Sequence, residues 1–365
     1  MEGHIEVINL HETKGNPLDL DETSITRGFE NFAHPKLVKQ LTSSNLVVRQ
    51  KSLLAARELI SIPEHRVRCF GAGIIGALVD CLAHENLQVQ QSAARNFSFL
   101  ASDAAGCEEL LKADAIVALL EATYVGDIDT ALECFNSLLV AAKKESVRAF
   151  FLEHHKFLDK LLEIAKDTVA SSKASSALKL IHLILEGRHN EETVDYLLQS
   201  DAIGVCASHL DSTSSDLKHS ASTVLAFLSV SDLGKEKAIA LGVVEPLLNM
   251  ALTADKKLQY SSSSCLMALA VANSGKKAIS EIDESKLRKC VQNLLDEGTE
   301  IIIMNCLQII SAAAEESKIR ACLKPFISKL NDMKPSLPKY VASHLNYAVR
   351  QLKFLSLPHR LENSS

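Results

Sequence analysis

Three glycines have the spacing of a phosphate-binding loop. Gly71, Gly73 and Gly76 match the GxGxxG pattern, in which the backbone closely approaches the pyrophosphate of a dinucleotide. That chemistry requires a strand before the glycines and a helix after them. Here they follow HRVRCF, which has the pattern of a helix end, and the corresponding segments elsewhere in the chain read ADAIVA and LGVVEP. The glycines therefore predict a tight turn between two helices.

Other residue types that do chemistry are not spaced for it. His154 and His155 stand beside Glu153 without the spacing that would place metal ligands on one helical face. The sequence contains no GxxxxGK[ST], HExxH, GxSxG or EF-hand pattern. We therefore expect no catalytic residue, no metal, no cofactor and no small-molecule substrate.

The cysteines and the apolar segments indicate a cellular environment. Nine cysteines occur singly and none forms a CxxC pair, which is typical of free buried thiols in a reducing compartment. The opening MEGHIEVINLHE lacks the basic and apolar regions of a secretory signal, and the most apolar stretch, 301–314, is too short to span a bilayer. We expect a soluble intracellular protein that makes no membrane contact.

Charge is distributed unevenly along the chain. The net charge is −6, and residues 1–30 contribute −5 of it through seven acids against Lys14 and Arg27. Residues 318–365 carry nine Lys and Arg against Asp332 and Glu362, a net +7. No basic stripe runs through the middle of the chain, which argues against nucleic-acid binding. We predict a basic patch that meets an acidic protein surface and consists of Lys318, Arg320, Lys324, Lys329, Lys334 and Lys339.

The elements that position these residues repeat along the chain. An amphipathic helix ends in a Leu or Ile eight times, at Leu59, Leu100, Leu138, Leu183, Leu228, Leu269, Ile310 and Leu352. The spacing is 38–45 residues, close to the period of armadillo and HEAT repeats. A shorter apolar segment precedes each helix, and Pro35, Pro246 and Pro325 share one slot near its start, where proline suits the first helical turn. Hydrophobic residues make up 47% of the chain and aromatic ones only 5%, which favours helices throughout.

The repeat resembles that of the armadillo family, whose unit is a short helix followed by two longer ones. Gly73 and Gly242, at the turn before the second helix, favour armadillo over HEAT repeats, the nearest alternative. The resemblance implies an all-α, right-handed armadillo-type α-solenoid of about eight helical repeats over residues 34–355. Residues 1–33 would then be an acidic N-terminal arm and residues 356–365 a C-terminal tail.

By this resemblance, the third helix of each repeat lines a concave groove. The residues one and five before each recurring Leu or Ile would face it. The Asn and Trp ladders of nuclear-import receptors are missing there, and so is the recurring Lys and Arg of catenin-type grooves. The predicted groove is mixed and partly apolar, with its protein-binding residues at Arg95, Phe99, Glu133, His182, Phe227, Asn305 and Tyr347.

The first repeat carries a closer resemblance. Pro35, Lys36 and Leu37, followed by Arg49, Gln50 and Lys51, are similar to the opening of the radial spoke head 14 homologue family, and residues 233–252 add to the likeness. Members of that family are armadillo proteins of the ciliary axoneme. The resemblance implies a non-catalytic scaffold that binds other proteins, as a radial spoke subunit of the cilium or flagellum. The alternative is a soluble cytosolic or nuclear armadillo adaptor, such as a cargo receptor or chaperone regulator.

Overall fold

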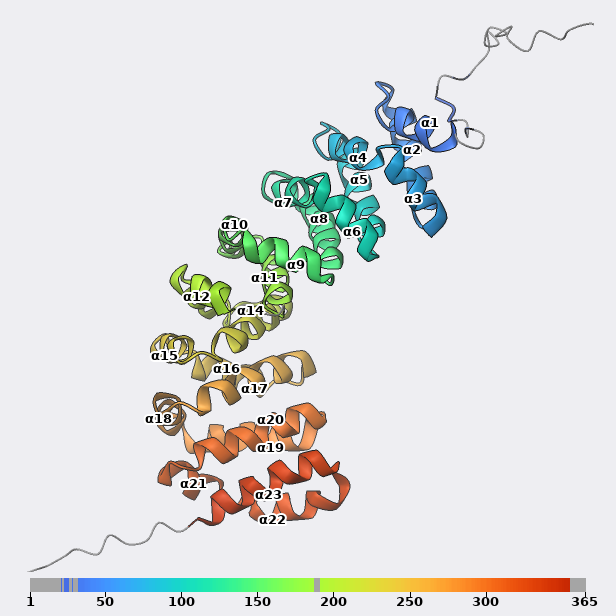
Figure 1. The fold of residues 1–365 in the computed structure, drawn as a ribbon. Coiled ribbons are helices and arrows are strands. Elements are labelled where there is room, and N and C mark those ends of the chain that lie inside the picture. Colours follow the sequence, from blue (N-terminus) through green and yellow to red (C-terminus); the bar gives the residue numbers. More distant parts are fainter. Residues whose placement is uncertain (1–20, 22, 26–27, 29–31, 187–190, 355–365) are drawn as a thin grey trace, which may run out of the picture.

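The chain folds into a stack of α-helices. A computed structural model describes residues 21, 23–25, 28, 32–186 and 191–354. That part of the chain consists of helices joined by turns and contains no strand, so the predicted all-α class is confirmed. The stack is elongated and bent, with α1 at one end and α23 at the other (Figure 1).

The helices form eight repeats of the predicted kind, and the first repeat has only its second and third helices within the described residues. The first helices are α3 (Pro63–Gly71), α6 (Ala104–Lys112), α9 (Glu145–Glu153), α12 (Glu191–Gln199), α15 (Asp232–Ala240), α18 (Asn273–Glu281) and α21 (Ser317–Leu323). The second helices are α1 (Ala33–Leu41), α4 (Ile74–Leu82), α7 (Ala115–Val125), α10 (Lys156–Ala165), α13 (Ala202–Ser208), α16 (Val244–Ala251), α19 (Glu284–Glu297) and α22 (Phe326–Met333). The third helices are α2 (Leu46–Ile60), α5 (Leu87–Leu100), α8 (Ile128–Ala141), α11 (Ser171–Leu185), α14 (Ser215–Leu228), α17 (Lys256–Ala270), α20 (Glu300–Ala313) and α23 (Lys339–Lys353). A single 3₁₀ turn, η2 (Lys334–Ser336), lies between α22 and α23.

The turn between first and second helices has a left-handed residue in four repeats. Gly73 has φ 82° and Gly242 has φ 71°, while Asp114 and Asp201 occupy the same slot with φ 52° and 59°. Glycine reaches this conformation without steric cost, and aspartate tolerates it better than most residues. The glycine pattern at Gly71 to Gly76 thus forms an interhelical turn between α3 and α4, as predicted.

Polar side chains start the third helices. Asn45, Asn86, Asp127, Ser214 and Asp255 each accept a hydrogen bond from a backbone N–H in the first turn of α2, α5, α8, α14 or α17. Such caps satisfy N–H groups that have no partner within the helix. They fix where each third helix begins, and therefore which of its faces is turned outward.

The core is continuous along the stack. Each third helix contacts the third helix of the next repeat, from α2 through α23. One cluster of buried side chains extends from Leu37 in α1 to Leu352 in α23. Within the described residues the helices span Ala33 to Lys353. Most of the predicted arm, 1–33, and the whole predicted tail, 356–365, lie outside the described residues.

Candidate protein-binding surface

Two buried hydrogen bonds set the register between successive third helices. Asn96 in α5 donates from Nδ2 to the carbonyl oxygen of Leu53 at 3.1 Å. Ser137 in α8 donates from Oγ to the carbonyl oxygen of Ala94 at 2.7 Å. Both bonds reach back 43 residues to the preceding third helix. Asn96 and Ser137 are therefore equivalent positions of neighbouring repeats.

This register corrects three of the eight predicted helix ends. Because Asn96 matches Ser137, Leu100 at the end of α5 matches Ala141 in α8, so Leu138 was placed three residues too early. In α11 the buried pattern places Ile184 at this position, and the predicted Leu183 is only half-buried. In α20, Arg320 donates to the carbonyl oxygen of Ala314 as Arg148 donates to that of Ala142. Ala313 therefore matches Ala141, and the predicted Ile310 was placed three residues too early. The surface positions read from the sequence shift accordingly in these three repeats.

With the corrected register, the outward surface of the third helices carries two parallel rows. The residue before each helix end is apolar in six consecutive repeats, and we call these residues the apolar row: Phe99, Val140, Leu183, Phe227, Ala268 and Ala312. The residue four positions earlier is polar in all six, and we call these residues the polar row: Arg95, Asn136, Lys179, Thr223, Ser264 and Gln308. The outward surface of the third helices that carries the two rows is named the third-helix face. The row positions of α8, α11 and α20 were missed in the sequence because the register of these three helices was wrong.

Arg95 of α5 lies close to two other predicted residues, Phe99 on the same helix and Glu133 on α8. Phe99 is 37% exposed and lies one helical turn from Arg95. The Nε atom of Arg95 is 2.8 Å from Oε1 of Glu133, so the pair connects α5 with α8. Both side chains contact solvent, and an exposed pair of this kind contributes less than about 1 kcal/mol to stability. The ion pair holds the Arg95 guanidinium beside the apolar row.

His182 and Phe227 meet across α11 and α14. Their ring centroids are 6.3 Å apart with an interplanar angle of 71°, an edge-to-face contact. Burial lowers the pKa of His182, although the nearby Glu186 carboxylate, 3.2 Å away, acts in the opposite direction. Phe227 is half-buried and also packs against the core. The structure therefore brings these two predicted residues together, with only part of each ring accessible.

Asn305 and Tyr347, on α20 and α23, differ in exposure. Asn305 is only 3% exposed, and its Nδ2 donates to the hydroxyls of Ser263 and Ser264 at 3.2 and 3.0 Å. The prediction of Asn305 as a surface contact is wrong, because the predicted end of α20 was three residues too early and Asn305 lies against α17. Gln308 and Ala312, the row positions of α20, are half-buried. Tyr347 is 50% exposed and occupies the polar-row position of α23.

The six predicted basic residues do not form one patch. Arg320 in α21 lies 5.6 Å from the ring of Phe354 and donates to the carbonyl oxygen of Ala314 at 2.6 Å. Lys339 begins α23, whose 15 residues span about 22 Å before Phe354 is reached. Lys329 is ion-paired with Asp296.

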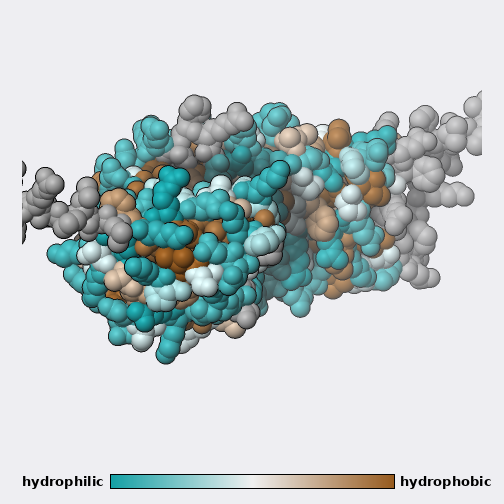
Figure 2. Space-filling model, turned by 90° about the horizontal axis from the view of Figure 1, so that it is seen from below, coloured by the Kyte–Doolittle hydropathy of each residue, from teal (hydrophilic) through white to brown (hydrophobic). Residues whose placement is uncertain are grey.

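The basic residues are thus spread over the last repeat, with Lys318 on α21, Lys324 just after it and Lys334 in η2. Seen end-on, this end of the stack shows a hydrophilic rim around a small apolar centre (Figure 2). A single acidic partner surface would have to cover the whole end of the molecule to meet all six side chains.

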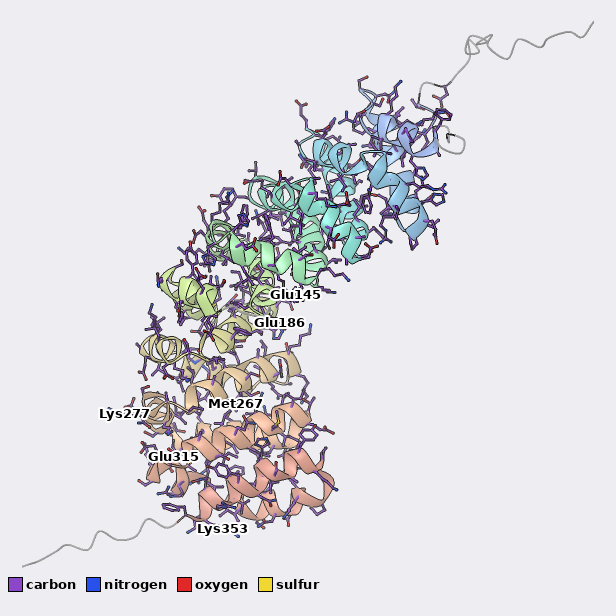
Figure 3. The ribbon with its side chains drawn as sticks, viewed as in Figure 1. Glu145, Glu186, Met267, Lys277, Glu315 and Lys353 are labelled. Carbon is purple, nitrogen blue, oxygen red and sulfur yellow. The ribbon has the colours of Figure 1, made fainter. Side chains whose placement is uncertain are left out.

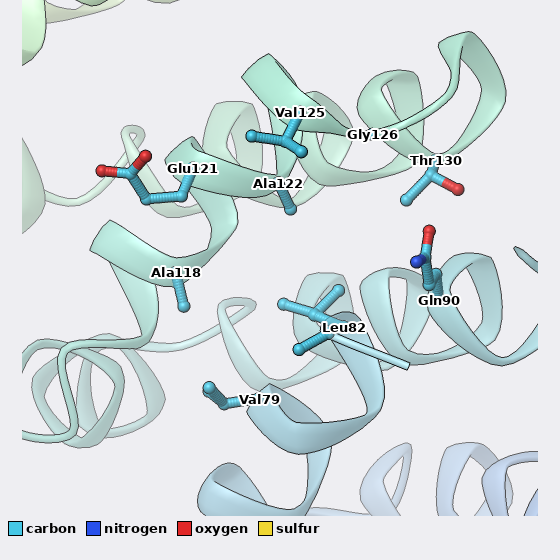
Figure 4. A pocket seen from close by; sticks show the side chains of 10 residues that line it. Val79, Leu82, Gln90, Ala118, Glu121, Ala122, Val125, Gly126 and Thr130 are labelled. Carbon is cyan, nitrogen blue, oxygen red and sulfur yellow. The ribbon is translucent and has the colours of Figure 1, made fainter. Parts of the chain in front are cut away.

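A cavity of about 380 Å³ lies between repeats two and three (Figure 4). Three small residues at intervals of four, Ala118, Ala122 and Gly126, leave this space because they carry little or no side chain. The remaining lining is mostly apolar. Its acidic residue, Glu121, is ion-paired with Lys160. The stripe of small residues was a sequence signal for this hollow, but the hollow holds no set of titratable groups that could do chemistry.

Neither metal-ligand groups nor reactive thiols gather in the described part of the chain. Over those residues no three His, Cys, Asp or Glu side chains come close enough to hold a metal ion. All nine cysteines are unpaired and buried, as predicted. Burial raises the pKa of Cys69, Cys81 and Cys107 to about 11, which keeps these thiols protonated. No helix within the described ranges is long and apolar enough to cross a bilayer.

Stacked units of three helices, left-handed turns before the second helix and a continuous layer of third helices define an armadillo-type α-solenoid. An engineered protein of known structure matches it with a TM-score of 0.57 at 18% identity, covering 88% of this chain and 89% of that one. A designed armadillo repeat protein solved with the peptide (KR)4 matches with a TM-score of 0.56 at 20% identity, over 64% of this chain and 98% of its own. No protein-family model matches the chain. Radial spoke protein 14 of Chlamydomonas reinhardtii is 31% identical over 375 residues, which cover 99% of this chain and 96% of that protein. The chain belongs to the radial spoke protein 14 family.

Proposed function

We propose that this chain is a non-catalytic scaffold of the radial spoke in the motile ciliary axoneme and that it binds other spoke proteins. The observation that carries the proposal is its similarity to a radial spoke protein along nearly the whole length of both chains. The alignment with that protein includes every repeat, and therefore the outward surfaces of the helices as well as the core.

The third-helix face is the surface we assign to protein binding. It combines an exposed aromatic ring at Phe99 and a guanidinium at Arg95 with a row of half-buried apolar side chains. Aromatic and arginine side chains contribute most of the binding energy at protein interfaces. An apolar row beside a polar row suits an extended segment, whose side chains alternate between the two.

Localisation in ciliated cells tests the proposal. We expect a tagged chain to localise along the axoneme and to remain there after detergent and salt extraction. A chain that is diffuse in the cytoplasm or nucleus, and that detergent releases, would instead be the soluble adaptor named as the alternative above.

A pair of matched variants tests the surface. Phe99→Glu places a carboxylate in the apolar row, whereas Val67→Glu makes the same kind of change on the first helix α3, where Val67 is 65% exposed. We expect axonemal retention to fall at least about tenfold for Phe99→Glu, since a buried unpaired charge costs several kcal/mol at an interface. Val67→Glu should be retained like the wild type. Equal retention of the two variants would remove the third-helix face from the proposal.

A further inference from the structure

Three cationic or titratable side chains come together on the third-helix face of repeats four to six. We name them the basic cluster: Lys179 of α11, His219 of α14 and Lys257 of α17. His219 Nδ1 lies 3.2 Å from the carbonyl oxygen of Lys257, which joins α14 to α17. Burial lowers the pKa of His219 most, and both lysines lower it further, while the carbonyl of Lys257 and the Asp216 carboxylate act in the opposite direction. The positive charge of this area therefore comes from the two lysines.

Acidic groups are scarce around this cluster. Over α11, α14 and α17 the sequence contains Lys173, Lys179, Lys218, Lys256 and Lys257 but only one acid, Asp216, a net charge of +4. Within the described ranges neither Lys179 nor Lys257 has a carboxylate partner. Positive charge without a partner beside an apolar row is complementary to a segment that carries both acidic and apolar residues.

The chain itself contains such a segment. Residues 1–20 include Glu2, Glu6, Glu12 and Asp19 against Lys14, a net charge of −3. Six aliphatic side chains are interspersed among them, at Ile5, Val7, Ile8, Leu10, Leu18 and Leu20. This composition matches the two rows and the basic cluster of the third-helix face.

The chain that directly follows this segment contacts the solenoid on the third-helix face. Lys51 of α2 donates from Nζ to the carbonyl oxygen of Thr23 at 2.9 Å. Lys51 occupies the position in α2 that Glu133 occupies in α8, two repeats further on, and Glu133 lies on the third-helix face with Arg95. The chain therefore meets the solenoid at the first repeat on the same side as the two rows.

Residues 1–20 are long enough to extend from α2 to the basic cluster. Third helices of neighbouring repeats pack about 10 Å apart, so α11 to α17 lie roughly 30–50 Å from α2. Twenty extended residues span up to about 66 Å. Residues 1–20 can thus pass along the apolar row and bring their first carboxylates to the basic cluster.

We propose that residues 1–20 bind along the third-helix face of their own chain, with the carboxylates of Glu2 and Glu6 at the basic cluster and the aliphatic side chains on the apolar row. This intramolecular contact does not rest on the proposed function.

Carbodiimide crosslinking of the purified full-length chain tests the contact directly, because the reagent joins a carboxylate to a lysine amine without a spacer. We expect crosslinked peptides that connect Glu2 or Glu6 to Lys179 or Lys257 in the monomer, and we expect them to decrease as salt is raised to 1 M. Crosslinks confined to Lys36, Lys39 or Lys51, near the point where the arm meets the solenoid, would overturn the proposal. So would crosslinks found only between two copies of the chain.

Competition with a free peptide gives a second, independent measurement. A fluorescent peptide of residues 1–20 is titrated with wild-type chain and with a chain whose own arm is neutralised by Glu2→Gln, Glu6→Gln, Glu12→Gln and Asp19→Asn. We expect at least tenfold tighter peptide binding to the neutralised chain, because a tethered arm competes at a high effective concentration. Equal binding to the two chains would mean that the face accepts acidic segments only from other molecules, and would overturn the intramolecular contact.

Charge reversal identifies the surface that the peptide uses. In the neutralised chain, Lys179→Glu with Lys257→Glu should weaken peptide binding at least tenfold. The matched control is Lys277→Glu with Lys324→Glu, which changes the net charge equally. Lys277 lies on α18 at the outer edge of the stack, whereas Met267 of the third helix α17 lies nearer its middle (Figure 3). Equal loss with the control pair would overturn the assignment to the basic cluster. None of these measurements contains a spoke protein, so their failure leaves the proposed function untouched.

Discussion

Gly106 packs against the carbonyl group of Leu100 so closely that a Cβ atom at Gly106 would lie 1.8 Å from that oxygen. The same contact recurs two further times, where a Cβ at Gly234 or Gly275 would lie 2.0 Å from the carbonyl oxygen of Leu228 or Leu269. In each case the first helix of one repeat begins directly on the last turn of the preceding third helix. The joint between these repeats therefore depends on the absence of a side chain.

Gly275→Ala should destabilise the protein by about 2–3 kcal/mol, since the obstructing atom is backbone and the helices must move apart. Gly71→Ala is the matched control, because a Cβ there meets nothing within 4 Å and Gly71 ends a helix. It should be neutral or stabilise by about 0.5 kcal/mol. Urea denaturation followed by circular dichroism measures both. An unchanged midpoint for Gly275→Ala would contradict the packing described here.

The hydrogen bonds that set the register should also contribute measurably to stability. Asn96→Ala removes a buried donor to the carbonyl of Leu53 and leaves a small cavity, so we expect a loss of about 1–3 kcal/mol. Ser137→Ala should cost about 1 kcal/mol. Ser98→Ala, which removes a local hydrogen bond to Arg95 on the same helix as Asn96, should change the unfolding free energy by less than about 0.5 kcal/mol. Comparable losses for all three would argue against a special role for the inter-repeat bonds.

Because the thiols are buried, we predict that the cysteines react much faster with Ellman's reagent in the unfolded protein than in the native protein. All nine cysteines are buried, and burial raises the pKa of Cys134, Cys206 and Cys290 to about 12. Because the thiolate is the reactive form, native protein should react with Ellman's reagent at most slowly. In 6 M guanidinium chloride all nine thiols should react within minutes. A thiol that reacts rapidly in the native state would show that its repeat opens to solvent.

The fold was predictable because its signals are local and recur in every repeat. The period, the proline slot and the turn at Gly73 and Gly242 each depend on a few neighbouring residues. The register of α8, α11 and α20 was not predictable in this way. The last turn of each helix contains several apolar residues, within LLVA in α8, HLIL in α11 and IISAA in α20, and periodicity alone does not choose among them. A hydrogen bond from Ser137 to the preceding repeat decides the first case, and that contact is not local.

The predicted site failed where packing between helices decides exposure. Asn305 was assigned to the surface because the end of α20 was placed three residues too early, and in the structure it lies against Ser263 and Ser264 of α17. The basic residues after position 317 are close in sequence, yet α23 reverses the chain direction and separates Lys339 from Arg320 by the length of a helix. Neither effect can be read from one repeat alone.

Stability should decrease as the pH falls from 6.5 to 5.5. The pKa values of His34, His182 and His219 are lowered, in each case chiefly by burial. A histidine with a lowered pKa binds fewer protons in the folded state than in the unfolded chain at pH values between its folded pKa and about 6.5. Acidification through that window therefore favours unfolding, by at most about 1.4 kcal/mol per pH unit for each histidine. Above pH 6.5 these three groups should leave the stability unchanged.

Replacing two of these rings tests the assignment. The double variant His182→Gln with His219→Gln should show a weaker dependence of the urea midpoint on pH between 6.5 and 5.5 than the wild type. The carboxylates with lowered pKa values, such as Asp127 and Asp296, do not interfere, because their contribution is lost only at more acidic pH. A variant with the same pH dependence as the wild type would show that other groups control acid sensitivity. A wild-type midpoint that rises on acidification would contradict the burial of the histidine rings.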